Sequence, residues 1–189
     1  MNNNKLYEQL IMAGFGGQGI MLAGKLLSQA AMNAGKEVTY MSSYGAEVRG
    51  GAANCMVIIA DEPIASPLVT SPTSLIALSK AALKKFGKAI CKNGLLVMNS
   101  SLIDELPDVD GSVAIVKVPA DEIALEIGTV KVANMVALGS YLAKRGILDI
   151  ESVCKALADV VAKRHQDILP LNIAALKRGA EFVKTQSRS

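Results

Sequence analysis

Four glycines lie between an apolar run and a helix-forming segment near the start of the chain, in the sequence Gly14-Phe15-Gly16-Gly17-Gln18-Gly19. A buried strand, a glycine turn and a helix in this order are typical of an α/β fold. Glycine lacks a Cβ atom and a helix start exposes unpaired N–H groups, so such a turn also suits a bound phosphate. The motif alone is about equally typical of a tight turn without a ligand.

Strand-like and helix-like segments alternate over the first two thirds of the chain. We predict strands at residues 9–13, 37–41, 54–60, 74–78, 95–99 and 113–118, and helices at 20–34 and 79–92. A proline-punctuated loop separates the third strand from the fourth. From residue 121 onward, apolar stripes at helical spacing predict helices alone. The sequence therefore predicts a three-layer, Rossmann-like α/β fold with a mostly parallel, doubly wound sheet, a helical C-terminal third and a single domain over residues 1–189.

The composition excludes several classes of protein. Apolar residues make up 51% of the chain, aromatic residues only 4%, and Trp is absent, which speaks against a nucleic-acid platform built on stacking side chains. Cys55, Cys91 and Cys154 are far apart, with no spacing typical of an iron–sulfur cluster, a zinc site or a disulfide scaffold. The N-terminal residues lack the apolar core of a signal peptide, and no apolar run reaches membrane-spanning length. We expect a cytoplasmic protein that does not enter a membrane.

A second glycine-rich segment follows the second predicted strand, over residues 42–51, and contains Arg49. That strand does not end in the acidic residue that holds a dinucleotide's ribose, so the usual NAD site is disfavoured. An arginine suits phosphate or carboxylate instead. Because parallel strands end at one edge of a sheet, we expect the two glycine loops to face one crevice. The alternative is that Glu47 pairs with Arg49 and the glycines only turn the chain.

Other polar residues give weaker signals. We expect Lys25 to be exposed to solvent, and His165 to be exposed or to complement the dipole at a helix C-terminus. We expect Asn134, in an apolar helix, to hydrogen-bond a neighbouring loop or subunit. The sequence contains no general acid–base pair, nucleophile–base arrangement or metal-ligand cluster that we identify, and we predict neither catalytic nor metal-ligating residues. A binding subunit of a larger enzyme fits this pattern better than a complete enzyme does.

Taken together, these motifs resemble the gamma subunit of 2-oxoacid:ferredoxin oxidoreductases. The likeness covers roughly residues 9–145 and rests on the segments GFGGQG (14–19), LAGKLL (22–27), SYGAEVRGG (43–51), VIIAD (57–61), IASP (64–67), VPADEIALEIG (118–128) and NMVALG (134–139). The two glycine loops in this order are far more specific than either motif alone.

The resemblance implies a non-autonomous subunit of an oxidoreductase that acts on an oxo group, with an iron–sulfur protein as electron acceptor. Such a complex decarboxylates a 2-oxoacid, forms an acyl-coenzyme A and passes two electrons to ferredoxin. In the family, the alpha and beta subunits hold thiamine diphosphate, and Mg and iron–sulfur clusters belong to partner chains, which can include a ferredoxin-like delta subunit. The second loop most resembles the 2-oxoglutarate type, while pyruvate, branched-chain oxoacid and indolepyruvate types stay open.

The resemblance also implies that this chain helps to bind coenzyme A. We assign backbone and amide contacts to the first loop and an opposing wall to the second, as cofactor-binding residues Gly14, Gly16, Gly17, Gln18, Gly19, Tyr44, Gly45, Arg49, Gly50 and Gly51. Two alternatives remain at this point: a free-standing nucleotide- or flavin-binding module, and a purely structural assembly subunit. The sequence also leaves open whether the isolated chain forms a homodimer.

Overall fold

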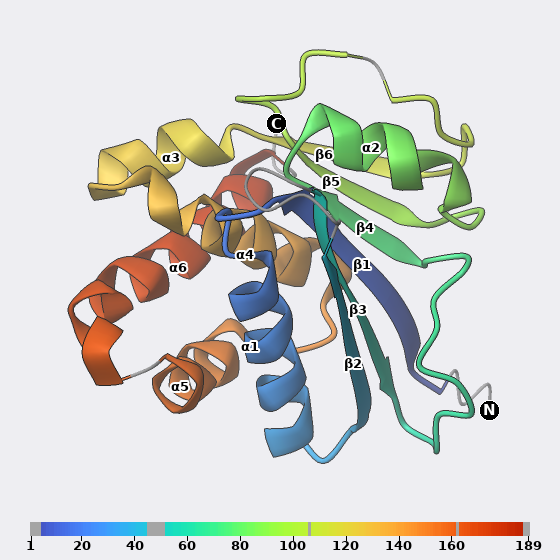
Figure 1. Cartoon of the computed structure of the whole chain (residues 1–189), viewed down its shortest axis with the longest axis horizontal. Coiled ribbons are helices and arrows are strands. Elements are labelled where there is room, and N and C mark those ends of the chain that lie inside the picture. Colours follow the sequence, from blue (N-terminus) through green and yellow to red (C-terminus); the bar gives the residue numbers. More distant parts are fainter. Residues whose placement is uncertain (1–4, 45–51, 106, 162, 187–189) are drawn as a thin grey trace.

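The computed structural model of the chain describes residues 5–44, 52–105, 107–161 and 163–186. Strands interspersed with helices occupy it up to residue 127, and helices alone follow from there (Figure 1). In chain order the elements are β1 (Tyr7–Phe15), α1 (Ile20–Asn33), β2 (Glu37–Tyr44), β3 (Ala52–Ala60), β4 (Ser74–Ala77), α2 (Lys80–Phe86), η1 (Gly87–Ala89), β5 (Leu95–Asn99), β6 (Ala114–Val118), α3 (Ala120–Ile127), η2 (Val130–Val132), α4 (Ala133–Arg145), α5 (Ile150–Val160), η3 (Lys163–Ile168) and α6 (Leu169–Gln186).

The strands of the described residues form one six-stranded sheet in the order β2-β3-β1-β4-β5-β6. The pairs β1–β4, β4–β5 and β5–β6 are parallel, whereas β3 is antiparallel to both β1 and β2. All strands except β3 therefore run in one direction, and the prediction of a mostly parallel α/β sheet is confirmed.

Helices cover both faces of this sheet (Figure 1). Along β1 the buried side chains alternate: Leu10 and Met12 pack in a core with α1, α4, α5 and α6, while Ile11 and Ala13 pack in a second core under α2. This alternation follows from the period of two in a strand. Apolar side chains on both faces explain why β1 reads as a continuous apolar run rather than an alternating one.

One local prediction differs from the structure, and the structure adds the direction of the third strand, which is not predicted from the sequence. The helix predicted at residues 79–92 ends as an α-helix at Phe86 and continues only as the 3₁₀ turn η1. The second and third strands form an antiparallel pair in which Tyr44 lies opposite Ala53, so the chain returns directly from β2 into β3. The short connection decides this, because a parallel neighbour requires a crossover of about a dozen residues or more.

Two glycines set the distance between α4 and α6. A Cβ atom added to Gly139 would lie 2.0 Å from the carbonyl oxygen of Leu176, and one added to Gly179 would lie 2.0 Å from that of Val136. The Ser140 hydroxyl lies 2.9 Å from the Gly179 oxygen. The two backbones are thus in direct contact, which only residues without a side chain permit.

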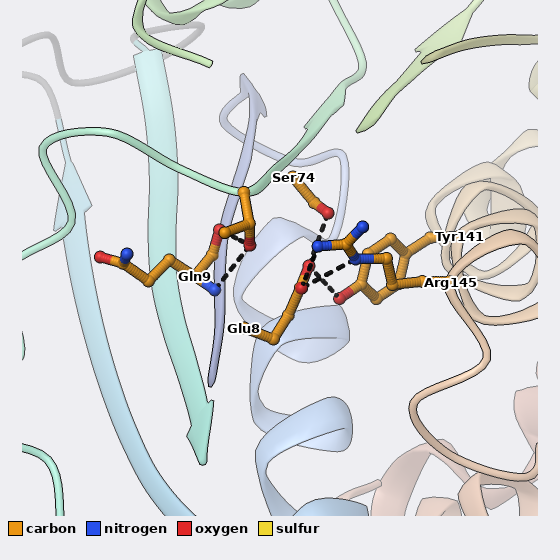
Figure 2. A network of polar contacts seen from close by, with 6 residues as sticks. Glu8, Gln9, Ser74, Tyr141 and Arg145 are labelled. Carbon is orange, nitrogen blue, oxygen red and sulfur yellow. Dashed lines mark hydrogen bonds and ion pairs between the residues drawn. The ribbon is translucent and has the colours of Figure 1, made fainter. Parts of the chain in front are cut away.

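A buried carboxylate joins the start of β1 to α4 (Figure 2). Glu8 is 1% exposed, and its Oε1 accepts hydrogen bonds from the Ser74 hydroxyl at 2.5 Å and the Tyr141 hydroxyl at 3.0 Å. Its Oε2 lies 2.8 Å from both Nε and an Nη of Arg145. Burial, followed by the Glu8 charge, raises the pKa of Tyr141 well above its usual value. Each charge is paired and hydrogen-bonded, as burial requires.

Candidate functional site

The first glycine loop is a tight turn whose backbone requires glycine at two positions. The Gln18 N–H donates to the Phe15 carbonyl at 3.2 Å, and Gly17 and Gly19 have φ values of 95° and 70°. Residues with a Cβ atom rarely adopt this left-handed conformation. A Cβ at Gly19 would also lie 2.4 Å from Asn134 Nδ2, whereas one at Gly17 would meet nothing within 4 Å. Gly17 therefore presents its bare backbone to open space.

The Gln18 carboxamide holds this loop together. Its Oε1 accepts from the Phe15 N–H at 2.7 Å, and its Nε2 donates to the Leu78 carbonyl at 3.1 Å. The side chain passes over Gly14, where a Cβ atom would lie 2.4 Å from Oε1. Gly14 thus makes room for Gln18, and Gln18 ties the end of β1 to the end of β4. A contact between the Gln18 amide and a ligand stays a prediction.

The loop leads into an uncapped helix. Gly19 is the N-cap of α1, its position supplies no side-chain hydrogen bond, and the first turn contains no acidic residue. The first N–H groups of a helix need an acceptor, and its dipole places partial positive charge at this end. The start of α1 is therefore suited to an anion.

The sheet topology opens a crevice beside this helix. The chain passes from β1 through α1 on one face and from β4 through α2 on the other, so the connections after these adjacent strands diverge (Figure 1). Ligands of open α/β sheets bind at this kind of switch point. The crevice holds a cavity of about 130 Å³ lined by Gly17, Gln18, Leu78, Asn99, Asp121, Val130, Lys131 and Ala133.

Two larger cavities adjoin the same loop. One, of about 240 Å³, lies between the loop, the start of α1 and Ala53 of β3. The other, of about 560 Å³, extends from Gly17 and Gly19 to the end of α5 and the start of α6. Gly17 lines all three cavities. The loop is therefore at the centre of the concave surface at this edge.

Lys131 is a candidate that the sequence analysis missed. It lies in η2, is exposed, and lines both the 130 Å³ and the 560 Å³ cavity. A lysine between two valines gives no signal that separates it from an ordinary surface residue, and only the fold brings it beside Gly17. The predicted contact of Asn134 with a neighbouring loop is confirmed, since its Nδ2 donates to the Gly19 carbonyl at 2.9 Å.

The second loop begins and ends beside the first. Ala52, the first residue of β3, is paired with Phe15, and Tyr44, the last residue of β2, is paired with Ala53. The connection between β2 and β3 therefore starts at the sheet edge where the first glycine loop lies. The predicted site residues Gly45, Arg49, Gly50 and Gly51 fall outside the described residues, as does Glu47, and the Tyr44 side chain is not described. Their contact with a ligand stays a prediction.

The remaining candidates lie elsewhere. Lys25 is exposed on α1, and the His165 side chain is not described. Cys55, Cys91 and Cys154 are free thiols, and burial raises the pKa of Cys55 to about 12, so this thiol stays protonated. Over the described ranges, no group of three or more His, Cys, Asp or Glu side chains is arranged to hold a metal ion. In the same ranges, no helix has the length and apolar character needed to cross a bilayer.

Comparison with known proteins gives a consistent result. Residues 9–182 match the family model "Pyruvate ferredoxin/flavodoxin oxidoreductase". The 2-oxoglutarate synthase subunit KorC of Methanocaldococcus jannaschii is 39% identical over 184 residues, which cover 95% of this chain and 96% of that protein. Relatives of this kind are subunits of oxidoreductases that act on oxo groups.

Solved structures share the fold. The gamma subunit of the keto/oxoacid ferredoxin oxidoreductase from Geobacter sulfurreducens PCA superposes with a TM-score of 0.80 at 31% identity, covering 94% of this chain and 99% of that one. The 2-oxoglutarate:ferredoxin oxidoreductase from Magnetococcus marinus, solved with 2-oxoglutarate, coenzyme A and succinyl-CoA bound, has a TM-score of 0.84 at 24% identity, over 95% of this chain and 31% of that one. The chain therefore belongs to the pyruvate ferredoxin/flavodoxin oxidoreductase family, as a gamma subunit of a 2-oxoacid:ferredoxin oxidoreductase.

Proposed function

We propose that this gamma subunit binds coenzyme A for a complex that oxidatively decarboxylates 2-oxoglutarate. The complex releases CO₂, joins the remaining acyl group to the coenzyme A sulfur and passes two electrons to ferredoxin. Support for coenzyme A comes from the Magnetococcus marinus enzyme, which was solved with this molecule bound. Support for the oxoacid comes from the resemblance to KorC, a 2-oxoglutarate synthase subunit.

The uncapped start of α1, beside three cavities, is the observation that carries the proposal. Coenzyme A carries a pyrophosphate and a 3′-phosphate. The pyrophosphate would accept hydrogen bonds from the backbone N–H groups of Gly17, Gly19 and Ile20, where no acidic side chain of the first helical turn repels it. Lys131 lies close enough to line the same space, and the Arg49 loop would supply the opposing wall.

We assign the remaining chemistry to partner subunits. Thiamine diphosphate with Mg belongs, in this proposal, to the alpha and beta subunits, and the iron–sulfur clusters to them or to a ferredoxin-like delta subunit. Family membership argues against a free-standing nucleotide or flavin module. Measurement of coenzyme A binding also tests the structural-assembly alternative.

Reconstitution of the complex tests this division of roles. The partner subunits with this chain should convert 2-oxoglutarate to succinyl-CoA and reduce ferredoxin, and the partners without it should lose acyl-CoA formation. Equal acyl-CoA formation with and without the chain would rule out the proposed role. Pyruvate and branched-chain oxoacids, supplied in parallel, test the substrate assignment separately.

Replacement of Arg49 with Ala should weaken coenzyme A binding. A charged hydrogen bond to a phosphate contributes about 1.5–3 kcal/mol. The KM for coenzyme A should therefore rise by the factor that corresponds to this loss of binding free energy, while the complex stays assembled. Arg178→Ala is a matched control, because Arg178 pairs with Glu126 at 2.9 Å on an exposed surface. An unchanged KM in Arg49→Ala, with an intact complex, would favour the structural-assembly alternative.

A further inference from the structure

The carboxamide of Asn134 is buried and only half of it is hydrogen-bonded. The side chain lies near the start of α4 and the residue is 4% exposed. Its Nδ2 donates to the Gly19 carbonyl at 2.9 Å, but across the described residues its Oδ1 has no hydrogen-bond partner. Buried polar atoms of native proteins are nearly always paired. An acceptor left without a donor beside a glycine loop therefore calls for an explanation.

The cavity beside Asn134 offers one. Asn134 lines the 560 Å³ cavity together with Gly17 and Gly19, so this space is continuous with the start of α1. Among the described residues the lining is mostly apolar, with the aliphatic side chains Leu22, Val160, Val161 and Ile168, and its other polar side chains besides Asn134 are Lys131, Asp167 and Asn172. A volume of this size falls within the range of small-molecule sites. A ligand that enters it should carry apolar carbons and at least one N–H donor.

We infer that this cavity holds the pantetheine arm of coenzyme A and that Asn134 Oδ1 accepts a hydrogen bond from one of its amide N–H groups. The inference rests on the proposed function, which places the phosphates of the same molecule at the start of α1. The arm combines methyl and methylene groups with two amides, which matches the mostly aliphatic described lining and the Asn134 Oδ1, an acceptor without a partner among the described residues. Asn134 would thus have two roles: its Nδ2 holds the glycine loop, and its Oδ1 accepts a hydrogen bond from the pantetheine arm.

The test separates these two roles by using two ligands on the assembled complex. Coenzyme A contains the phosphates and the arm, whereas 3′-phospho-ADP (adenosine 3′-phosphate 5′-diphosphate) contains the nucleotide, the 3′-phosphate and the pyrophosphate without the arm. Asn134→Ala removes both Asn134 contacts, so a shifted loop should weaken both ligands equally. If Oδ1 binds the arm, the variant should weaken coenzyme A binding about fivefold more than the binding of 3′-phospho-ADP. Asn33→Ala, at the far end of α1, should change neither affinity.

A change in the ligand gives an independent measurement without altering the protein. Coenzyme A analogues in which one amide N–H of the arm is replaced by an ester oxygen should bind the unmodified complex about fivefold more weakly at one of the two positions. The same replacement should have less than a twofold effect in Asn134→Ala. Equal weakening of both ligands by Asn134→Ala, together with no effect of either ester, would overturn the inference and leave the proposed function standing. Binding of neither coenzyme A nor 3′-phospho-ADP by the unmodified complex would overturn both.

Discussion

Replacement of Gly139 with Ala is expected to lower the free energy of unfolding by about 3 kcal/mol or more, an effect at the upper end for overpacked sites. The added methyl group would lie 2.0 Å from the Leu176 carbonyl oxygen. Backbone atoms cannot move aside as a flexible side chain can, so α4 and α6 would have to separate. The Ser140 contact with the Gly179 oxygen, at 2.9 Å, would lengthen with them.

Urea denaturation of the purified chain, followed by circular dichroism, measures this change. Gly179→Ala should have a similar effect, since its methyl would lie 2.0 Å from the Val136 carbonyl oxygen. Gly111→Ala is the matched control, because a Cβ there meets no atom within 4 Å and it should stay within about 0.5 kcal/mol of the unmodified chain. If Gly139→Ala were as stable as Gly111→Ala, the direct backbone contact between α4 and α6 would be contradicted.

Replacement of Arg145 with Met is expected to destabilise the chain by about 3 kcal/mol, the usual size of the effect when one member of a buried ion pair is removed. The substitution leaves the Glu8 carboxylate, 1% exposed, with two hydroxyl donors and no positive charge. The methionine roughly preserves the apolar stem of the arginine. The loss of folding stability therefore comes mainly from the uncompensated negative charge of Glu8.

A double-mutant cycle isolates that charge effect. Glu8→Gln combined with Arg145→Met should be more stable than Arg145→Met alone, because the double variant buries no unpaired charge. Lys144→Met, at the neighbouring exposed position of α4, makes the same chemical change and should stay within about 0.5 kcal/mol of the unmodified chain. Equal destabilisation at positions 144 and 145 would contradict an energetic role for the Glu8 pair.

Much of the local structure could be predicted because the signals are local. The strand predicted at residues 95–99 has the same bounds as β5, and the helix predicted from residue 20 is α1. The turn between β1 and α1 requires glycine at positions 17 and 19, because Gly17 and Gly19 have positive φ values. A few consecutive residues are enough to identify the apolar run, the glycine turn and the helical period of the apolar residues. The same residues determined the family resemblance.

Features that depend on distant contacts could not be predicted in the same way. Glu8, a charged residue in an apolar strand, gives no sequence signal of burial, because its partners Tyr141 and Arg145 are 133 and 137 positions away. Lys131 is likewise an ordinary lysine until η2 packs beside Gly17. The place of β3 between β1 and β2 also follows from pairing between segments that are far apart in the chain.

The sequence by itself thus determined the α/β class, the glycine turn at the start of α1 and the family, since short-range sterics and periodicity encode them. Only the tertiary structure decided that β3 lies between β1 and β2, that Glu8 is buried against Arg145, and that Gly19 is the residue that the Asn134 carboxamide contacts. Those outcomes depend on the free energy of packing residues far apart in the chain, which no window of consecutive residues contains.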